Sequence, residues 1–443
     1  MKRRTFFIES LGCAKNTVDS ESMAALLQQD GYQLVEKPGD ADVMIVNTCG
    51  FIQPAREESL GELKQLAKKK RKNQVLIAAG CLPQRSAQMI VQEVPGVDGI
   101  LSTRRWPDIV RLAQLLRGQP GKPHYDLPDV EKTEMDAVGV VRAAVQGGSA
   151  YLKIADGCRR NCAFCSIPII KGTAVSRPVE AIVSDAHRLE EAGVQELILI
   201  AQDTTDYGSD LGMRDGLAAL LERLTSETPQ IPWLRILYAF PGFVTDHLID
   251  VMASRSQIVH YLDIPLQHAH AGLLKSMHRP ANLTWVDKTL AKMRRAMPDL
   301  ALRTTFIVGY PGETETEFST LLDFVRQTEF DHVGVFAYSF EPGTPGEPLG
   351  DPIPEEVKQE RVERLMALQE QISLKKNQAK VGSRLDVLVE GYNQGISIGR
   401  TYRDAPEIDG LVLIEGKTEV GQIVPVYITG AMTHDLVGLP AGK

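Results

Sequence analysis

A loop with three cysteines constrains this chain more than any other stretch of its sequence. It follows a strand-like run at residues 151–155 and places Cys158, Cys162 and Cys165 in a C-x-x-x-C-x-x-C array. Thiolates are soft ligands that favour zinc, copper(I) or iron–sulfur clusters. Three such ligands leave a four-thiolate zinc site incomplete without a distant fourth. They can hold a four-iron cluster through three irons and leave one iron open. A structural zinc loop or a set of buried thiols is the alternative.

Three further cysteines each follow an apolar, strand-like run within the first 120 residues. Helix-like segments separate the runs, and this alternation predicts an open parallel α/β sheet. Parallel strands end at one edge, where such sheets bind ligands. We therefore expect Cys13, Cys49 and Cys81 at one rim, as a second three-thiolate cluster site, with three unrelated core cysteines as the alternative. The runs are residues 5–10, 43–47 and 75–79, and the helix-like segments are about 19–30 and 55–70.

Composition indicates an ordinary soluble protein of two or three domains. The chain has 443 residues, of which 43% are hydrophobic and 24% charged. Glu9 interrupts the first apolar run, so the start does not resemble a signal peptide. No stretch approaches the ~20 apolar residues of a membrane span. We expect a cytoplasmic protein without a membrane partner, whose six cysteines serve metal binding or catalysis rather than disulfides.

Residues 119–148 are rich in glycine, proline and charge, which predicts a linker. The linker would join an N-terminal domain, residues 1–118, to a core domain, residues 149–376. The core repeats a strand–helix pattern six times. Six units suggest a partial (β/α) barrel that is open on one side. The expected strands are residues 151–155, 196–200, 234–237, 260–264, 301–308 and 332–336. The expected helices are residues 178–192, 216–224, 245–253, 284–297, 315–326 and 354–376.

Polar residues on or after these strands are candidates for a cofactor pocket. Gln202 follows the second strand, Arg303 lies on the fifth, and Gly309 follows that same strand. An arginine can pair a carboxylate bidentately, and a glycine lets the backbone approach a ligand closely. Ordinary hydrogen bonding at the barrel rim is the alternative for Gln202 and Arg303.

Residues 377–443 contain short alternating strands that predict a small antiparallel β-barrel. Their six basic and eight acidic residues give a net charge of −2. Phosphate binding favours the opposite sign, so this module suits a basic protein better than RNA. The loop at residues 403–410 concentrates the acidity, and we expect it to face the partner. Direct RNA binding, for example by the basic run at residues 68–72, is a secondary possibility.

The cysteine loop, with Phe164 before its last cysteine, resembles the signature of radical S-adenosylmethionine (SAM) enzymes. In that superfamily SAM chelates the open iron and is cleaved to a deoxyadenosyl radical. The resemblance implies that Phe164 lies near the adenine. The segments around Gln202, Arg303 and Gly309 resemble the SAM pocket of the same enzymes.

The first 120 residues resemble the methylthiotransferase family, whose N-terminal domain binds an auxiliary cluster. Leu11-Gly12-Cys13-Ala14-Lys15-Asn16, Asn47-Thr48-Cys49 and Gly80-Cys81 match its three motifs. The terminal module is similar to the TRAM domain that ends these enzymes. Ala14-Lys15 departs from the tRNA-modifying branch and is similar to the branch that acts on a ribosomal protein, as is the Pro-Glu-x-Asp-Gly sequence that ends at Gly410.

This resemblance implies an α/β enzyme that inserts a methylthio group at the β-carbon of an aspartate of ribosomal protein uS12. The implied cofactors are two 4Fe–4S clusters and SAM, which serves as radical source and methyl donor. An electron donor is a further expected partner. A tRNA methylthiotransferase is the nearest alternative. A non-catalytic iron–sulfur electron carrier or ribosome-assembly factor is an alternative of another class.

Overall fold

The structure is a computed structural model that describes residues 4–119, 121–125, 131–137 and 139–442. Two compact units make up the chain. The first consists of Met1–Ala144, Leu152–Arg177 and Ser339–Glu347, and the second of Val145–Tyr151, Pro178–Tyr338 and Pro348–Lys443. All six cysteines therefore belong to the first unit.

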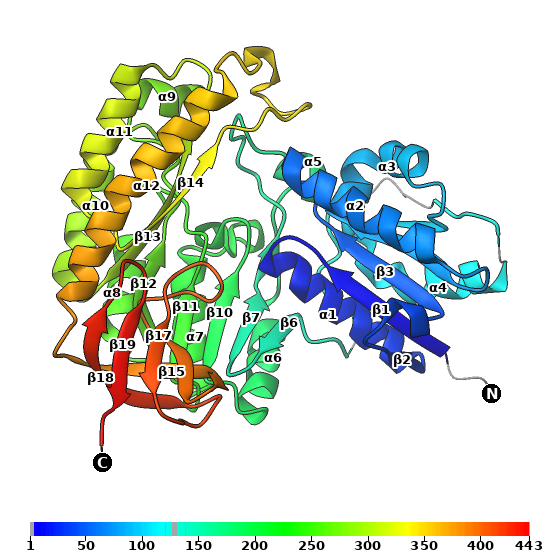
Figure 1. The fold of residues 1–443 in the computed structure, drawn as a ribbon, viewed down its shortest axis with the longest axis horizontal. Coiled ribbons are helices and arrows are strands. Elements are labelled where there is room, and N and C mark those ends of the chain that lie inside the picture. The colour runs from blue at the N-terminus through cyan, green and yellow to red at the C-terminus, as the bar shows by residue number, and fades with distance from the viewer. Residues whose placement is uncertain (1–3, 120, 126–130, 138, 443) are drawn as a thin grey trace. The chain divides into compact units, whose positions relative to one another are not determined.

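A five-stranded sheet of order β2-β1-β3-β4-β5 forms the centre of the first unit (Figure 1). Every neighbouring pair is parallel, which confirms the expected open α/β sheet. The strands are β1 (Arg4–Ser10), β2 (Tyr32–Leu34), β3 (Val43–Thr48), β4 (Val75–Gly80) and β5 (Gly99–Ser102). The helices are α1 (Ala14–Gln29), α2 (Gln53–Lys69), α3 (Cys81–Glu93) and α4 (Ile109–Gly118).

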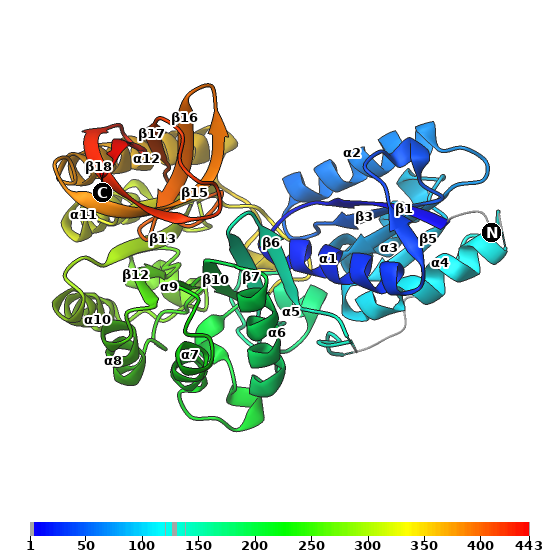
Figure 2. The same cartoon turned by 90° about the horizontal axis from the view of Figure 1, so that it is seen from below.

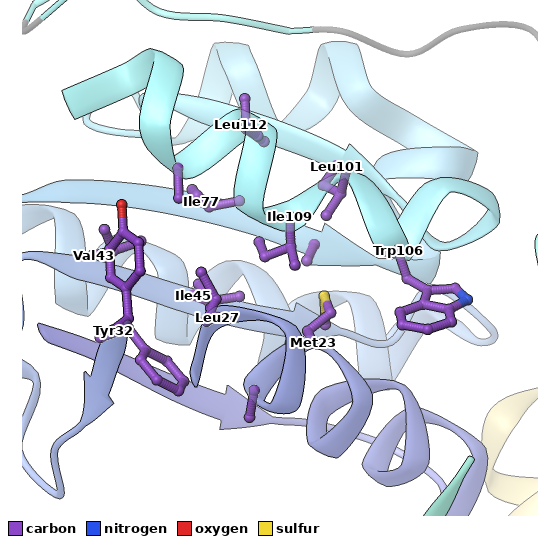
Figure 3. Packing of buried hydrophobic residues seen from close by; sticks show 14 of the residues in the cluster. Met23, Leu27, Tyr32, Val43, Ile45, Ile77, Leu101, Trp106, Ile109 and Leu112 are labelled. Atoms are coloured by element: carbon purple, nitrogen blue, oxygen red, sulfur yellow. The ribbon is translucent and has the colours of Figure 1, made fainter. Parts of the chain in front are cut away.

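Helices cover both faces of this sheet, as Figure 2 shows for α1 and α2. Alternate residues of a strand face opposite sides, so Ile45 of β3 packs with α1 and α4 while Met44 packs with α2 and α3. Figure 3 shows the first of these cores, in which Met23 and Ile109 are almost fully buried. β3 and β4 are buried along their whole length, which explains why they appear in the sequence as continuous apolar runs.

The first unit also contains the three-cysteine loop. β8 (Ala155–Asp156) precedes the loop, α5 (Ile167–Lys171) follows it, and β9 (Val175–Ser176) pairs antiparallel with β8. The two short strands thus close the loop at its base.

A seven-stranded sheet of order β14-β13-β12-β11-β10-β7-β6, the core sheet, forms the centre of the predicted core domain (Figure 1). Its two edges, β14 and β6, are unpaired in this order, so the expected open, partial barrel is confirmed. The strands are β6 (Ala143–Gln146), β7 (Ser149–Lys153), β10 (Glu196–Ile200), β11 (Trp233–Ile236), β12 (Ile258–Asp263), β13 (Ala301–Val308) and β14 (His332–Ala337). The helices are α6 (Val179–Glu191), α7 (Gly216–Glu227), α8 (Asp246–Ser254), α9 (Ala271–Ser276), α10 (Leu283–Ala296), α11 (Glu315–Thr328) and α12 (Glu355–Gln378).

The segment expected as a linker, residues 119–148, contains structure that its composition does not suggest. Its last part forms β6, an additional strand of the core sheet. Thr133 donates a hydrogen bond from Oγ1 to the carbonyl of Lys171 at 3.0 Å, and Lys132 forms a β-bridge with Gly172. Residues 120, 126–130 and 138 of this segment lie outside the described residues.

Residues after α12 close into a β-barrel of order β15-β16-β17-β19-β18, which confirms the expected terminal module. Closure leaves no exposed sheet edge. One pair, β17–β19, is parallel and the others are antiparallel. The strands are β15 (Arg384–Asn393), β16 (Ile396–Thr401), β17 (Val412–Glu415), β18 (Ile423–Ala431) and β19 (Leu436–Pro440), the last of which the sequence pattern did not reveal.

The acidic loop before β17 does not form the expected partner-facing surface. Asp404 is 5% exposed, and the side chain of Asp409 is 1% exposed. Asp409 accepts a hydrogen bond from Tyr261 at 2.6 Å and pairs with Arg303 at 3.2 Å. The prediction that this loop presents its acidity to a partner is wrong for both aspartates, because they join the barrel to the core sheet. Only Glu407 among the loop's three acidic residues is exposed.

Candidate functional site

Three cysteines follow neighbouring strands at the carboxyl edge of the first unit's sheet, as expected. Cys13, Cys49 and Cys81 follow β1, β3 and β4, which are neighbours in the sheet. Cys13 caps the N-terminus of α1, Cys81 is the first residue of α3, and Cys49 stands shortly before α2. A helix N-terminus favours negative charge, and it stabilises a thiolate in the same way.

Close backbone approach brings these cysteines together. Gly12 has φ +94°, and a Cβ on it would lie 2.9 Å from the Cβ of Cys49. Asn16 donates from Nδ2 to the carbonyls of Leu11, at 2.9 Å, and Thr48, at 3.1 Å. The same amide group accepts a hydrogen bond from the Cys81 thiol at 3.6 Å. The Asn16 side chain thereby links the segments that carry all three cysteines.

Burial makes these thiols hard to ionise without a cation. It raises the pKa of Cys81 to about 12, although the Lys171 ammonium opposes the shift. Burial also raises the pKa of Cys49, against hydrogen bonds from the backbone amides of Phe51 and Gly50. A bound metal centre supplies the positive charge that deprotonates such thiols. Since every one of the six cysteines is a free thiol, the donor set fits an iron–sulfur cluster.

The second cysteine loop is held by its own backbone. The amide of Cys158 donates to the carbonyl of Gly172 at 3.0 Å, and the amide of Arg160 donates to the sulfur of Cys158 at 3.4 Å. Gly157 has φ +76°, and a Cβ there would lie 2.1 Å from the carbonyl oxygen of Thr173. Only glycine fits this approach. These contacts fix the backbone of the loop that carries Cys158, Cys162 and Cys165.

Arg85 and Glu341 connect the Cys49 segment with the segment 339–347, and no sequence signal pointed to them. The Arg85 guanidinium donates to the carbonyls of Gly50, at 2.8 Å, and Phe51, at 2.9 Å. It also pairs with Glu341 at 2.7 Å. The carbonyl of Phe51 accepts a further hydrogen bond from Ser166, which directly follows Cys165. The two cysteine-bearing segments are thus hydrogen-bonded to each other within one unit.

Among the described residues, no three His, Cys, Asp or Glu side chains are grouped tightly enough to bind a single metal ion. The ligand roles of the six cysteines therefore stay predictions. Their placement at one strand edge and in one loop is what the structure provides.

The four candidates for the SAM pocket fall into two groups. Phe164 is half-buried within the cysteine loop of the first unit. In the second unit, Gln202 follows β10 and is half-buried. Gly309 follows β13 at φ +72°, and a Cβ there would lie 2.4 Å from Cγ of Lys358. This glycine is thus required by its contact with α12, whatever the pocket binds.

Arg303 lies near the start of β13 rather than at its carboxyl end. Its guanidinium pairs with Asp263 at 3.1 Å and with Asp409 at 3.2 Å. Both carboxylates raise the pKa of Arg303 against the effect of burial. These pairs give Arg303 a structural role, and its part in cofactor binding stays a prediction, as it does for the other three residues.

Three segments of the chain match known protein families. Residues 5–102 match the model "Uncharacterized protein family UPF0004", residues 152–325 match the radical SAM superfamily, and residues 381–440 match the TRAM domain. A protein named "Ribosomal protein uS12 methylthiotransferase RimO" from Chloroflexus aurantiacus is 46% identical over 450 residues, covering 98% of this chain and 99% of its own length. The chain belongs to the RimO-type uS12 methylthiotransferase family. A family member from Roseiflexus sp. is 45% identical and covers 98% of this chain and 96% of its own length.

The fold of this RimO-type chain is also similar to that of a solved radical SAM methyltransferase. The structure of TsrM from Kitasatospora setae covers 78% of this chain and 77% of its own, with a TM-score of 0.58 at 13% identity. Membership of the radical SAM superfamily implies SAM and a 4Fe–4S cluster as cofactors. No helix in the described part of the chain combines the length and the apolarity needed to cross a membrane.

Proposed function

We propose that this chain inserts a methylthio group at the β-carbon of an aspartate in ribosomal protein uS12, with two 4Fe–4S clusters. The observation that carries the proposal is that one compact unit contains both cysteine trios, in a chain whose relatives are named uS12 methylthiotransferases. An aliphatic C–H bond offers no acidic proton and no leaving group, so acid–base catalysis does not reach it. A radical cofactor does, and the protein orients and shields it.

Cys158, Cys162 and Cys165 would hold the radical SAM cluster and leave one iron open for SAM. Cys13, Cys49 and Cys81 would hold the auxiliary cluster. When bound, the clusters and SAM supply the radical and the sulfur for the reaction. An external electron donor is required, and the proposed site of action is the cytoplasm, where uS12 is made.

The chain's own residues position and protect this chemistry. Backbone amides of Arg160, Gly50 and Phe51 hydrogen-bond to cysteine sulfurs, and such bonds tune the potential of a cluster. Cys81 and Cys162 are buried, so water is excluded from two of the ligands. Phe164, Gln202, Arg303 and Gly309 remain candidates for SAM binding.

The choice of uS12 over tRNA rests on the relatives and on Ala14-Lys15, because the burial of Asp404 and Asp409 removes most of the argument from the acidic loop. A tRNA substrate is therefore the outcome against which the proposal is tested. Mass spectrometry of uS12 and of tRNA nucleosides from cells lacking this protein separates the two. We expect the modified aspartate of uS12 to disappear and the tRNA to stay unchanged; loss of a tRNA methylthio group would contradict the proposal.

Complementation tests the role of the trio Cys13, Cys49 and Cys81. The wild-type gene should restore the modification of uS12. A Cys13→Ala/Cys49→Ala/Cys81→Ala variant should not restore it, although the purified variant should still form deoxyadenosine from SAM on reduction. If the protein were a non-catalytic iron–sulfur carrier, neither the wild type nor the triple variant would form deoxyadenosine. Iron is expected to fall to roughly half in the triple variant, since one of two clusters is lost; unchanged iron would reject the auxiliary site.

A further inference from the structure

Four buried side chains form a closed square of ion pairs in the first unit. The Lys153 ammonium lies 2.6 Å from Asp19 and 3.1 Å from Asp156. The Lys171 ammonium lies 3.0 Å from Asp19 and 2.9 Å from Asp156. Each ammonium thus binds both carboxylates, and each carboxylate binds both ammonium groups. Arg142 adds a fifth charge through its 2.7 Å contact with Asp19.

The corners of this square come from the segments that carry the cysteines. Asp19 lies on α1, the helix that begins after Cys13. Asp156 ends β8 just before Cys158, and Lys171 ends α5, the helix that follows Cys165. The square therefore holds the cysteine loop at both of its ends and ties both ends to α1.

All four side chains are at most 3% exposed, so their charges depend on one another. Burial alone would raise the pKa of Asp19, but Lys153, Lys171 and Arg142 lower it to about 2. Asp19 is thus ionised at neutral pH. Asp156 lies between the same two ammonium groups. Buried charges remain paired only in a narrow range of geometries. A buried charge that moves away from its partner is no longer compensated for the cost of its desolvation.

We infer that this square is a positioning device that fixes the three-cysteine loop relative to α1, and thereby the spacing between the two cysteine trios. The inference rests on the proposed function only in treating those trios as cluster ligands. Asp19, Asp156, Lys153 and Lys171 are positioning residues, since they reach the reaction through the segments that they hold.

The first test needs no cluster. Hydrogen–deuterium exchange is measured on the full chain without iron, for the wild type and for Asp19→Asn. We expect amides of residues 157–166 to exchange roughly tenfold faster in the variant, since one partner of a buried pair is lost. The buried strands β3 and β4 should exchange as before. Lys64→Gln, which removes an exposed ion pair with Glu93 in the same unit, is the control and should change neither segment.

A balanced double variant keeps the test decisive if Asp19→Asn unfolds. Asp19→Asn/Lys171→Met removes one charge of each sign and leaves the Lys153–Asp156 pair intact, yet it cuts both links from α1 to the loop. Faster exchange of residues 157–166 in this variant, with β3 and β4 unchanged, supports the inference. Wild-type exchange of the loop would overturn it.

The second test uses the reconstituted enzyme and measures the spacing itself. Two reduced clusters in one protein couple magnetically, and the coupling depends on the distance between them. In the double variant with full iron we expect a weaker or broader spin–spin coupling in the EPR spectrum than in the wild type. An identical coupling would contradict the inference. Iron content in the cysteine triple variants tests the proposed function separately, because the exchange experiment contains no cluster.

Discussion

Gly12 lies against the side chain of Cys49: a Cβ on this glycine would come within 3.2 Å of the cysteine sulfur and 2.9 Å of its Cβ. The close approach comes from two loops that follow neighbouring strands, β1 and β3. A left-handed φ of +94° at Gly12 adds strain for any larger residue. The first cysteine site therefore depends on a residue that contributes no ligand.

Gly12→Ala should impair that site without unfolding the chain. The new methyl group must displace Cys49, so we expect iron to be lost from the first site and retained at the second. Iron analysis of Gly12→Ala in a chain with Cys158, Cys162 and Cys165 replaced by alanine measures the first site alone. Gly61→Ala is the matched control, because nothing lies within 4 Å of its Cβ position on α2. It should stabilise the chain by about 1 kcal/mol and leave the iron content unchanged.

Glu341→Gln should destabilise the first unit. The Glu341 side chain is 1% exposed and pairs with Arg56 at 2.5 Å and Arg85 at 2.7 Å, so the substitution leaves two arginines short of their counter-charge. Loss of one partner of a buried pair costs about 3–5 kcal/mol. Urea denaturation measures this loss. Glu93→Gln removes the exposed pair with Lys64 and should cost less than about 1 kcal/mol; equal losses in the two variants would contradict the assignment.

Glu196 should make the second unit sensitive to acid. Its buried carboxylate lies between Arg235, at 2.7 Å, and Arg400, at 2.8 Å. Burial alone would raise the pKa, but the two arginines lower it from 4.5 to about 2. A carboxyl group whose pKa is lower in the folded state than in the unfolded state stabilises the fold at pH values above its unfolded-state pKa. The stabilisation by Glu196 is therefore fully present above pH 4.5 and is lost as the pH falls toward 2. It amounts to about 3 kcal/mol.

Unfolding in urea at neutral pH and at acid pH checks this dependence. The wild type should lose stability between the two conditions. Glu196→Gln should be less stable at neutral pH and should lose less on acidification, since its amide does not titrate. A variant with the full wild-type acid dependence would show that other carboxylates are responsible.

Arg303 and Asp409 should behave as an energetic pair. Arg303→Met and Asp409→Asn each leave a buried charge without one of its partners, so each should lower the stability of the second unit. In the double variant the losses should not add, because both substitutions remove the same interaction. If Arg303 acts only through its ion pairs with Asp263 and Asp409, the KM for SAM in deoxyadenosine formation stays unchanged in Arg303→Met. A raised KM would assign it to the cofactor instead.

Much of the fold could be predicted because local patterns determine it. β3 and β4 are continuous apolar runs, and their parallel arrangement places Cys49 and Cys81 at one edge. The sequence pattern missed β2, β5, β6, β9 and β19, each of which has five residues or fewer, and β19 ends in proline. Their pairing partners, not their own sequences, make them strands.

The roles of charged residues were harder to predict, because burial depends on tertiary contacts. Asp409 looks like a surface residue in an acidic turn, yet it is buried against Tyr261 and Arg303. Glu341 follows a strand and carries no sequence motif, although it binds two arginines of the first domain. Neither partner is close in sequence, so no local pattern could have indicated these contacts.

The Arg303–Asp409 pair limits how the terminal barrel can be exchanged between relatives. A chimera that grafts a foreign barrel without an acid at this position would remove one of the two carboxylates that pair with Arg303 and leave only Asp263. Its loss of activity could then be mistaken for altered substrate recognition. Experiments that exchange the barrel to change specificity should transfer residue 303 together with it, so that the ion pair between residues 303 and 409 is kept.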